Sequence, residues 1–127
     1  MSLLFLWALV GLQIKHYIAD YTLQWPWMIA GKCHFNRSGG YLHAGIHILL
    51  TLIVLLFCNL SVAVIALLLV FEFVVHYATD YTKGSYDFAH KLSANSRRFW
   101  VIHGADQLVH QFTYAVILAV IVYSNQP

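Results

Sequence analysis

Residues 41–82 read YLHAGIHILLTLIVLLFCNLSVAVIALLLVFEFVVHYATDYT. Two almost uninterrupted apolar runs fill this stretch, and only Asn59, Leu60 and Ser61 separate them. Each run is close to the ~20 residues that a helix needs to cross a bilayer. Asn59 is suited to end a helix, and Ser61 is suited to cap the next one. The stretch therefore predicts a tight hairpin of two membrane-spanning helices, over residues 41–58 and 62–82.

Similar apolar segments lie on either side of this hairpin, over residues 2–22 and 99–123. The chain of 127 residues is 61% hydrophobic and 9% charged, whereas a typical soluble domain is about 25% charged. Apolar runs of this length also rule against strands. We therefore predict an all-α fold: a four-transmembrane-helix bundle that forms one integral membrane domain over residues 1–127. The formal net charge of +2 is too small to favour a nucleic-acid partner.

The basic residues predict the orientation of this bundle. All Lys and Arg except Lys15 lie in or beside the two longer connections, around residues 23–40 and 83–98. The positive-inside rule then places these connections in the cytoplasm and both termini outside, with an aromatic belt that includes Trp25 and Trp100. Cys33 and Cys58 fall on opposite faces in this arrangement, so we expect no disulfide between them.

A short motif occurs twice at an offset of 60 residues: HYIADYT at residues 16–22 and HYATDYT at residues 76–82. The same offset places His43 on His103 and His47 on Gln107. Both copies end an odd-numbered helix on the same membrane face. We interpret the chain as two tandem helical hairpins related by a pseudo-two-fold axis along the membrane normal.

Eight histidines are unusual in so apolar a chain. In every predicted helix, ionisable side chains recur three or four positions apart, which places them on one helix face. With a rise of 1.5 Å per residue, four helices of alternating direction bring most of these groups to one layer in the cytoplasmic half. Burying a charge there costs roughly 2.5–3.5 kcal/mol, so we expect inward-facing groups that are paired or metal-bound. The candidate metal ligands are His16, Asp20, His43, His47, His76, Asp80, Asp106 and His110.

Imidazoles and carboxylates together suit Zn, Mn or non-haem Fe, and helix bundles hold such ions with ligands from facing helices. We expect one or two divalent ions. Hydrogen bonding between single His–Asp pairs is the simpler explanation for any one pair, but the number of groups favours metal. Glu72 could serve as a further ligand, and the alternative is that it is a neutral acid hydrogen-bonded to His110. The residues expected to support the ligands are Glu72, His103, Gln24, Gln107 and Lys83.

This set of residues resembles the small bacterial and phage membrane proteins grouped as domain-of-unknown-function family 3307. The resemblance covers nearly the whole chain and implies a bacterial inner-membrane location. The residue pattern is also similar, more distantly, to that of membrane-bound metal-dependent hydrolases with inward-facing His and Asp. Glu72 and His103 are not part of the pattern. Four motifs carry it: His16-x3-Asp20-x3-Gln24, His43-x3-His47, His76-x3-Asp80-x2-Lys83 and Asp106-Gln107-x2-His110.

The favoured function is a metal-dependent hydrolase that acts at the cytoplasmic leaflet. A divalent ion lowers the pKa of a coordinated water, and an uncoordinated Asp or His then serves as general base. We assign these catalytic roles to His47 and Asp106. Site depth and the basic residues around Lys83 suggest a lipid phosphate or another amphipathic substrate from the surrounding membrane lipid. An oxidative di-iron reaction fits the ligands nearly as well.

Two other functions remain open. A metal-ion or proton transporter needs polar groups through both membrane halves. The outer half is almost entirely apolar, so a path would need a homodimer. A structural membrane protein, with polar His and Asp contacts between helices, is the third alternative.

Overall fold

The computed structural model describes residues 3–126. Four helices are long and apolar enough to cross a membrane, and the described residues contain no strand. The protein is therefore an all-α, multi-pass membrane protein, which confirms the predicted four-helix fold. Ser2, included in the first predicted helix, lies outside the described residues. The elements are α1 (Leu3–Tyr17), the π-helix η1 (Ile18–Thr22), α2 (Pro26–Gly31), α3 (Ser38–Leu55), α4 (Val62–His90) and α5 (Arg97–Ser124).

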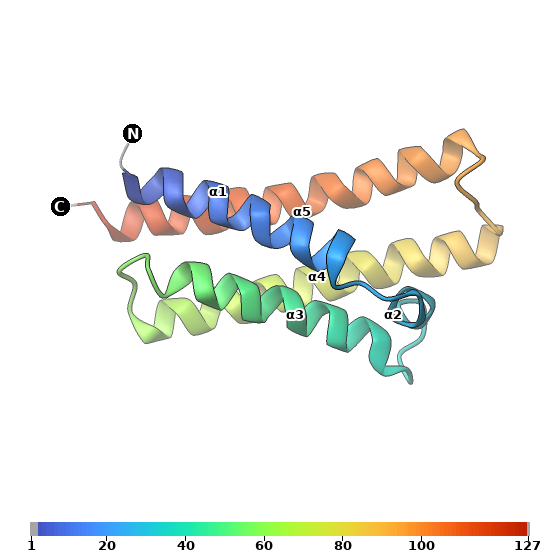
Figure 1. Ribbon diagram of the computed structural model, residues 1–127, viewed down its shortest axis with the longest axis horizontal. Helices are drawn as coiled ribbons and strands as arrows, with labels where there is room; N and C mark the ends of the chain where they lie inside the picture. The colour runs from blue at the N-terminus through green and yellow to red at the C-terminus, as the bar shows by residue number, and fades with distance from the viewer. Residues whose placement is uncertain (1–2, 127) are drawn as a thin grey trace.

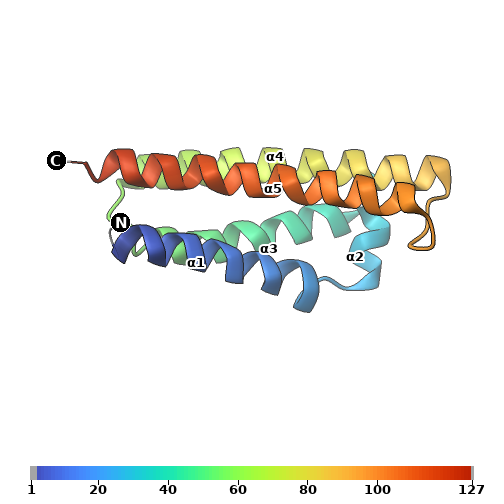
Figure 2. The ribbon, with the colours of Figure 1, turned by 90° about the horizontal axis from the view of Figure 1, so that it is seen from above.

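The four long helices form two layers, with α4 and α5 in one and α1 and α3 in the other (Figure 2). Around the bundle, α1 contacts α3, α3 contacts α4, α4 contacts α5, and α5 contacts α1. The start of α1, the end of α5 and the α3–α4 turn lie at one end of the bundle (Figure 1). The helix α2 and the α4–α5 connection lie at the opposite end, so both longer connections share one side, as four spans require.

Two helices extend beyond the predicted spans. At 1.5 Å per residue the 29 residues of α4 are roughly 44 Å long, which exceeds a hydrocarbon core of about 30 Å. The predicted ends at residues 82 and 99 mark where the chain becomes polar, but helical hydrogen bonding continues to His90 and resumes at Arg97. Hydropathy locates the membrane boundary, whereas the helix ends depend on backbone hydrogen bonds.

The α3–α4 turn has the expected chemistry, although α3 runs over Ser38–Leu55 rather than residues 41–58. Asn59 adopts a left-handed conformation (φ 50°), which Asn tolerates better than most residues. The Ser61 hydroxyl accepts a hydrogen bond from the Val64 backbone N–H at 3.3 Å and so caps α4. These two residues make the hairpin tight.

The sequence indicates at most a kinked continuation of the first helix after residue 22. The short helix α2 is therefore not predicted as a separate element. Pro26 occupies its first turn, and Trp25 before it is extended (φ −88°, ψ 153°), as a residue preceding proline prefers. A Cβ on Gly39 would lie 2.8 Å from the Met28 carbonyl oxygen, so α2 packs backbone-to-backbone on α3. This close packing holds the end of α2 over the bundle and fixes the position of Lys32.

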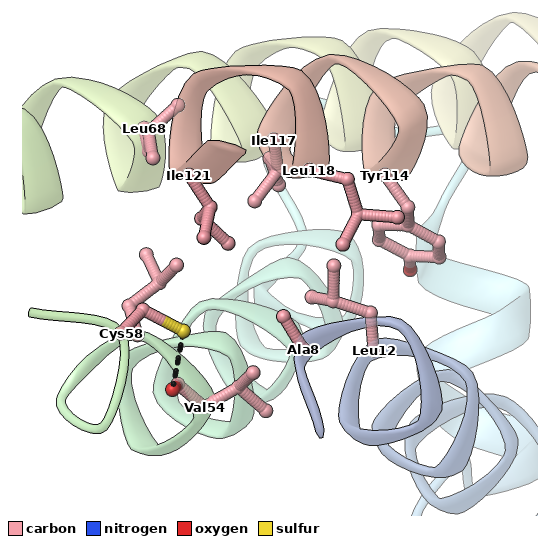
Figure 3. Close-up of a cluster of buried hydrophobic side chains, with 10 residues drawn as sticks. Ala8, Leu12, Val54, Cys58, Leu68, Tyr114, Ile117, Leu118 and Ile121 are labelled. Carbon is pink, nitrogen blue, oxygen red and sulfur yellow. Dashed lines mark hydrogen bonds between the residues drawn. The ribbon is translucent and has the colours of Figure 1, made fainter. Parts of the chain in front are cut away.

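Apolar side chains fill the end of the bundle where the termini lie (Figure 3). All four long helices contribute to this apolar cluster, so it closes that half of the bundle by side-chain packing. The Cys58 thiol donates a hydrogen bond to the Val54 carbonyl at 3.3 Å, and burial raises the pKa of this thiol. Cys33 and Cys58 are both free, as expected. The cluster consists of Ala8, Leu12, Val54, Leu55, Cys58, Leu68, Tyr114, Ile117, Leu118 and Ile121.

Candidate metal centre

Four buried imidazoles meet in the middle of the bundle. His43 and His47 from α3 are 0% exposed, and His76 from α4 and His110 from α5 are 1% exposed. The His47 and His76 ring centroids lie 3.9 Å apart, and those of His76 and His110 lie 4.2 Å apart. The i,i+4 spacing within α3 places both of its histidines on the inward face. The structure thus brings together side chains that lie far apart in the sequence.

The possible ligand atoms form two groups, in each of which all atoms lie within 4.8 Å of one another. His76 belongs to both groups. Ligand atoms bound about 2.0–2.2 Å from one ion lie within about 4.4 Å of each other, so small side-chain shifts would suffice for coordination. The first group is Asp20, His43, His47 and His76, and the second is His76, Asp80 and His110.

Several of these atoms have no hydrogen bond within residues 3–126. The Nε2 atoms of His43, His76 and His110 are buried and lack a partner, although carboxylate oxygens approach them at distances from 3.2 to 3.6 Å. A buried polar atom without a hydrogen bond costs about 1–3 kcal/mol. Convergent ring nitrogens of this kind are the donors that Zn, Mn or Fe prefers, and an ion would satisfy several at once.

Asp20 reaches the centre from the π-helix η1. Its carboxylate lies 2.9 Å from His47 Nε2, 3.2 Å from His43 Nε2 and 3.3 Å from His16 Nε2. The π-helical turn lies at the end of the first span, and such turns often occur at functional sites. Among the described residues, no Lys or Arg lies within 4.0 Å of this carboxylate. The side chains that contact this carboxylate are therefore histidines and Gln107 rather than lysines or arginines.

Asp80 reaches the centre from α4 and has a different set of partners. Lys32 Nζ from the end of α2 lies 2.8 Å from Asp80 Oδ2. The Asp80 carboxylate also lies 3.3 Å from His76, 3.4 Å from His43 and 3.5 Å from His110. Sequence reasoning missed Lys32, because nothing local shows that α2 folds back over the bundle.

Lys15 is the second site residue that sequence reasoning missed. It is 3% exposed, its ammonium contacts the Glu72 carboxylate directly, and its Nζ lies 3.1 Å from His47 Nδ1. Glu72 thus pairs with Lys15 across the bundle, rather than with His110 as the alternative interpretation had it. The signal was present in the sequence: Lys15 is the one basic residue placed away from the longer connections.

The Lys15 contact restricts what His47 can do. When the ammonium donates to His47 Nδ1, a neutral ring carries its proton on Nε2 and donates it to Asp20 Oδ1 at 2.9 Å. That tautomer has no lone pair left for an ion. Coordination through His47 Nε2 requires Lys15 to release Nδ1, so His43, His76 and His110 are the better-prepared ligands.

His16, predicted as a ligand, is engaged elsewhere in the structure. Its Nδ1 lies 2.9 Å from the Tyr114 hydroxyl and its Nε2 lies 2.8 Å from Gln107 Oε1. Gln107 in turn donates to Asp20 Oδ2 at 3.4 Å and to Asp106 Oδ2 at 3.3 Å. These contacts orient the acidic side chains, and His16 belongs to neither ligand group among the described residues.

A polar cavity of about 390 Å³ adjoins the centre at the end where the longer connections lie. Asp20, Asp80 and Asp106 line it together with Lys32 and Lys83. Asp106 is 7% exposed, its Oδ1 has no hydrogen bond within residues 3–126, and this atom lies 3.6 Å from His110 Nε2. The carboxylate is therefore outside both ligand groups but faces the space beside them.

The remaining predicted supporting residues surround this cavity rather than the ligands. His103 stacks on the Phe99 ring with centroids 6.0 Å apart. Gln24 donates to the Asp20 backbone carbonyl at 2.9 Å. Lys83 pairs with Asp87 at 3.3 Å.

The charges of the buried groups do not balance without a further cation. Four carboxylates from three elements, η1, α4 and α5, lie in this half of the bundle, and within residues 3–126 Lys15 and Lys32 are the only lysines or arginines that pair with them. Two negative charges remain, and buried charges need compensation. A divalent ion provides it, as would two protonated imidazoles. The four carboxylates are Asp20, Glu72, Asp80 and Asp106.

Comparisons with known proteins support the resemblance seen in the sequence. Residues 8–126 match the profile of a family described as "Protein of unknown function (DUF3307)". No curated protein and no solved structure matches the chain. The matched segment contains every residue of both ligand groups. This multi-pass helical protein therefore belongs to the DUF3307 family.

Proposed function

We propose that the protein binds a divalent metal ion inside the helix bundle and uses it to hydrolyse a membrane amphiphile. The observation that carries this proposal is the pair of ligand groups that share His76, in each of which the possible ligand atoms lie within 4.8 Å of one another. The Nε2 atoms of His43, His76 and His110, which belong to these groups, are buried and have no hydrogen bond in residues 3–126. Asp20 and Asp80 supply the adjacent anionic oxygens. This mixed donor set suits Zn, Mn or Fe.

The ligand groups support one bound ion more directly than two. His76 is common to both groups, and each residue offers one ligand atom. A second ion would have to rely on Asp80 and His110, with Asp106 moving toward them from its position 3.6 Å from His110.

Asp106 would handle protons in such a reaction, and His47 would position Asp20. An ion in the centre would lower the pKa of a coordinated water toward neutrality. Asp106 lines the cavity, and its buried Oδ1 has no hydrogen bond within residues 3–126, so this carboxylate can accept a proton, which is the role of a general base. His47 links Lys15 to Asp20 and holds that carboxylate in place.

A proton relay is the second candidate, and one observation favours it. Glu72, Lys15, His47 and Asp20 form a continuous chain of polar contacts from the inside of α4 to the polar cavity. The apolar cluster of Figure 3 lies between this chain and the other end of the bundle. A relay through the membrane would therefore need a second copy of the chain to continue the path.

The orientation and location also belong to the proposal. The basic residues of the longer connections support a cytoplasmic position for α2 and the polar cavity, with both termini outside. The bacterial inner membrane is the location that fits this orientation. The substrate would then come from the cytoplasmic leaflet.

Metal analysis of the purified protein tests the site. We expect about one Zn, Mn or Fe per chain after reloading and dialysis in detergent, and loss of most of it in His76→Ala. His90→Ala is the matched control, because His90 is an exposed histidine at the end of the same helix. Both variants should keep the wild-type helicity by circular dichroism. A wild-type protein without metal, or a His76→Ala variant with full metal, would contradict the site.

Turnover separates the hydrolase from the relay. The metal-loaded protein in nanodiscs should release phosphate from dodecyl phosphate, or dodecanoate from p-nitrophenyl dodecanoate. Asp106→Asn should retain the metal and lose at least about 100-fold in rate, within the range of general-base catalysis. Absence of metal-dependent turnover on both probes, combined with proton flux in proteoliposomes, would replace the hydrolase by the relay.

A further inference from the structure

A groove of about 400 Å³ runs between α4 and α5 on the outside of the bundle. The two helices lie side by side to the far end of the molecule (Figure 1). Ala78 on α4 and Ala105 on α5 are both exposed, and their small side chains leave the groove open. Most of the groove lies within the spanning segments, where lipid chains surround the protein. Its full lining is Ala78, Thr79, Thr82, Lys83, Tyr86, Ile102, Ala105, Asp106 and Val109.

The wall of this groove is apolar even where the sequence is polar. The Thr79 hydroxyl donates to the Val75 carbonyl and the Thr82 hydroxyl to the Ala78 carbonyl, both at 2.7 Å. These bonds satisfy the hydroxyls within α4, as threonines in membrane helices commonly do. Hydrocarbon can therefore line the groove without leaving a buried polar group unpaired.

The groove meets the polar cavity of the candidate metal centre. Lys83 and Asp106 line both spaces. A ligand that fills both must have an apolar chain for the groove and a polar head for the cavity. A head that passes from the groove into the cavity passes Asp106, whose buried Oδ1 has no hydrogen bond within residues 3–126.

We propose that the α4–α5 groove is the substrate-chain site of this protein: it holds one hydrocarbon chain of a membrane amphiphile whose phosphate head lies in the polar cavity. This inference rests on the proposed metal function, because without an ion the carboxylates of the cavity outnumber its lysines. A divalent ion held by Asp20 and the adjacent histidines would offset this negative charge. Lys32 and Lys83, whose present partners are Asp80 and Asp87, line the same cavity and would then be available to an anionic head. An anionic head then complements the cavity.

Photolabelling tests the site directly. The probe is a dodecylphosphonate, whose C–P bond is not hydrolysed, with a diazirine near the end of its chain, added to the metal-loaded protein in phosphatidylcholine nanodiscs. We expect adducts within residues 78–86 and 102–109, competed by dodecylphosphonate but at least tenfold less by inorganic phosphate or dodecyltrimethylammonium. Ala105→Trp should fill the groove and lower these adducts at least tenfold. Leu108→Trp is the matched control, since Leu108 is an exposed residue of the same helix that does not line the groove.

The outcomes separate this inference from the metal site itself. Adducts spread over all lipid-facing helices, or unchanged in Ala105→Trp, would overturn the groove while metal content stays stoichiometric. Specific adducts in a protein that holds no metal would support the groove and overturn the metal function. Removal of the metal by a chelator should weaken competition by dodecylphosphonate at least tenfold. Equal competition by this compound with and without metal would overturn the head-group assignment.

Discussion

The two copies HYIADYT (residues 16–22) and HYATDYT (residues 76–82) differ at only two positions, yet they fold differently. The first ends in the π-helix η1, and the second lies inside the continuous helix α4. The difference comes from the residues after each copy: Pro26 ends the first helix, whereas no proline interrupts α4. Similar local sequences therefore deliver their His and Asp side chains to one centre from differently shaped helices.

The two aspartates also have different electrostatic partners. Asp20 faces histidines and Gln107, whereas Asp80 has Lys32 at 2.8 Å. Lys15 and Glu72 extend this asymmetry, because the repeat offset places them on Val75 and Leu12, both apolar. The comparison indicates that Asp20 is the carboxylate most available to an ion and that the lysines stabilise the bundle. Changing either copy alone can test this division of roles.

The largest effect should come from Lys15→Met, which removes the basic residue that directly precedes the first copy and has no counterpart before the second. Glu72 is 1% exposed and would lose its cation, and breaking a buried pair typically costs about 3–5 kcal/mol. We expect the free energy of unfolding in detergent, measured by denaturant titration, to fall by about that amount.

The double variant Lys15→Met/Glu72→Leu controls for this loss. It removes both charges, and well-packed apolar replacements of buried pairs are often neutral. The apolar residues at the equivalent repeat positions show what such replacements look like. Stability within about 1 kcal/mol of wild type is expected. A single variant as stable as wild type would show that the pair does not hold α1 to α4.

The next effect concerns the two aspartates directly. Asp20→Asn should lower the metal affinity by more than the roughly 10–100-fold that loss of an outer hydrogen-bond partner causes, with little change in unfolding. Asp80→Asn should instead lower the free energy of unfolding by about 1–3 kcal/mol, because it leaves the partly exposed Lys32 ammonium without its carboxylate. Metal titration and denaturant unfolding on both variants measure the contrast.

Lys32→Met/Asp80→Asn completes this comparison. The double variant should recover most of the stability that Asp80→Asn loses, since no uncompensated ammonium remains. Equal losses of metal and of stability in Asp20→Asn and Asp80→Asn would mean that the two copies are functionally equivalent after all.

The smallest effect should come from converting the second copy into the first, with Ala78→Ile/Thr79→Ala. Ala78 is exposed and Thr79 is partly exposed, and both line the groove on the outside of the bundle, where substitutions usually change stability by about 0.5 kcal/mol or less. We expect metal affinity within twofold of wild type and unchanged helicity, while the larger isoleucine side chain in place of Ala78 reduces photolabelling in the α4–α5 groove. A tenfold change in metal affinity would show that the heptapeptide itself, rather than its surroundings, shapes the centre.

The amino-acid pattern was enough to predict the four spans, the all-α class, the shared side of the longer connections and the inward-facing stripes. These follow from hydropathy and from the 3.6-residue period, which are local properties of the chain. The same stripes predicted eight ligands, and six of them form the two ligand groups: Asp20, His43, His47, His76, Asp80 and His110. His16 and Asp106, which the stripes also predicted, lie outside both groups.

Which of these groups pair with one another depends on how the helices pack in three dimensions. The contacts of Lys15 with Glu72, of Lys32 with Asp80 and of His16 with Tyr114 depend on how the helices rotate and dock. The π-helical turn at Asp20 and the fold-back of α2 are also results of packing. A periodic pattern defines the face on which a side chain lies, but the partner across the bundle is a non-local choice that packing and charge compensation make together.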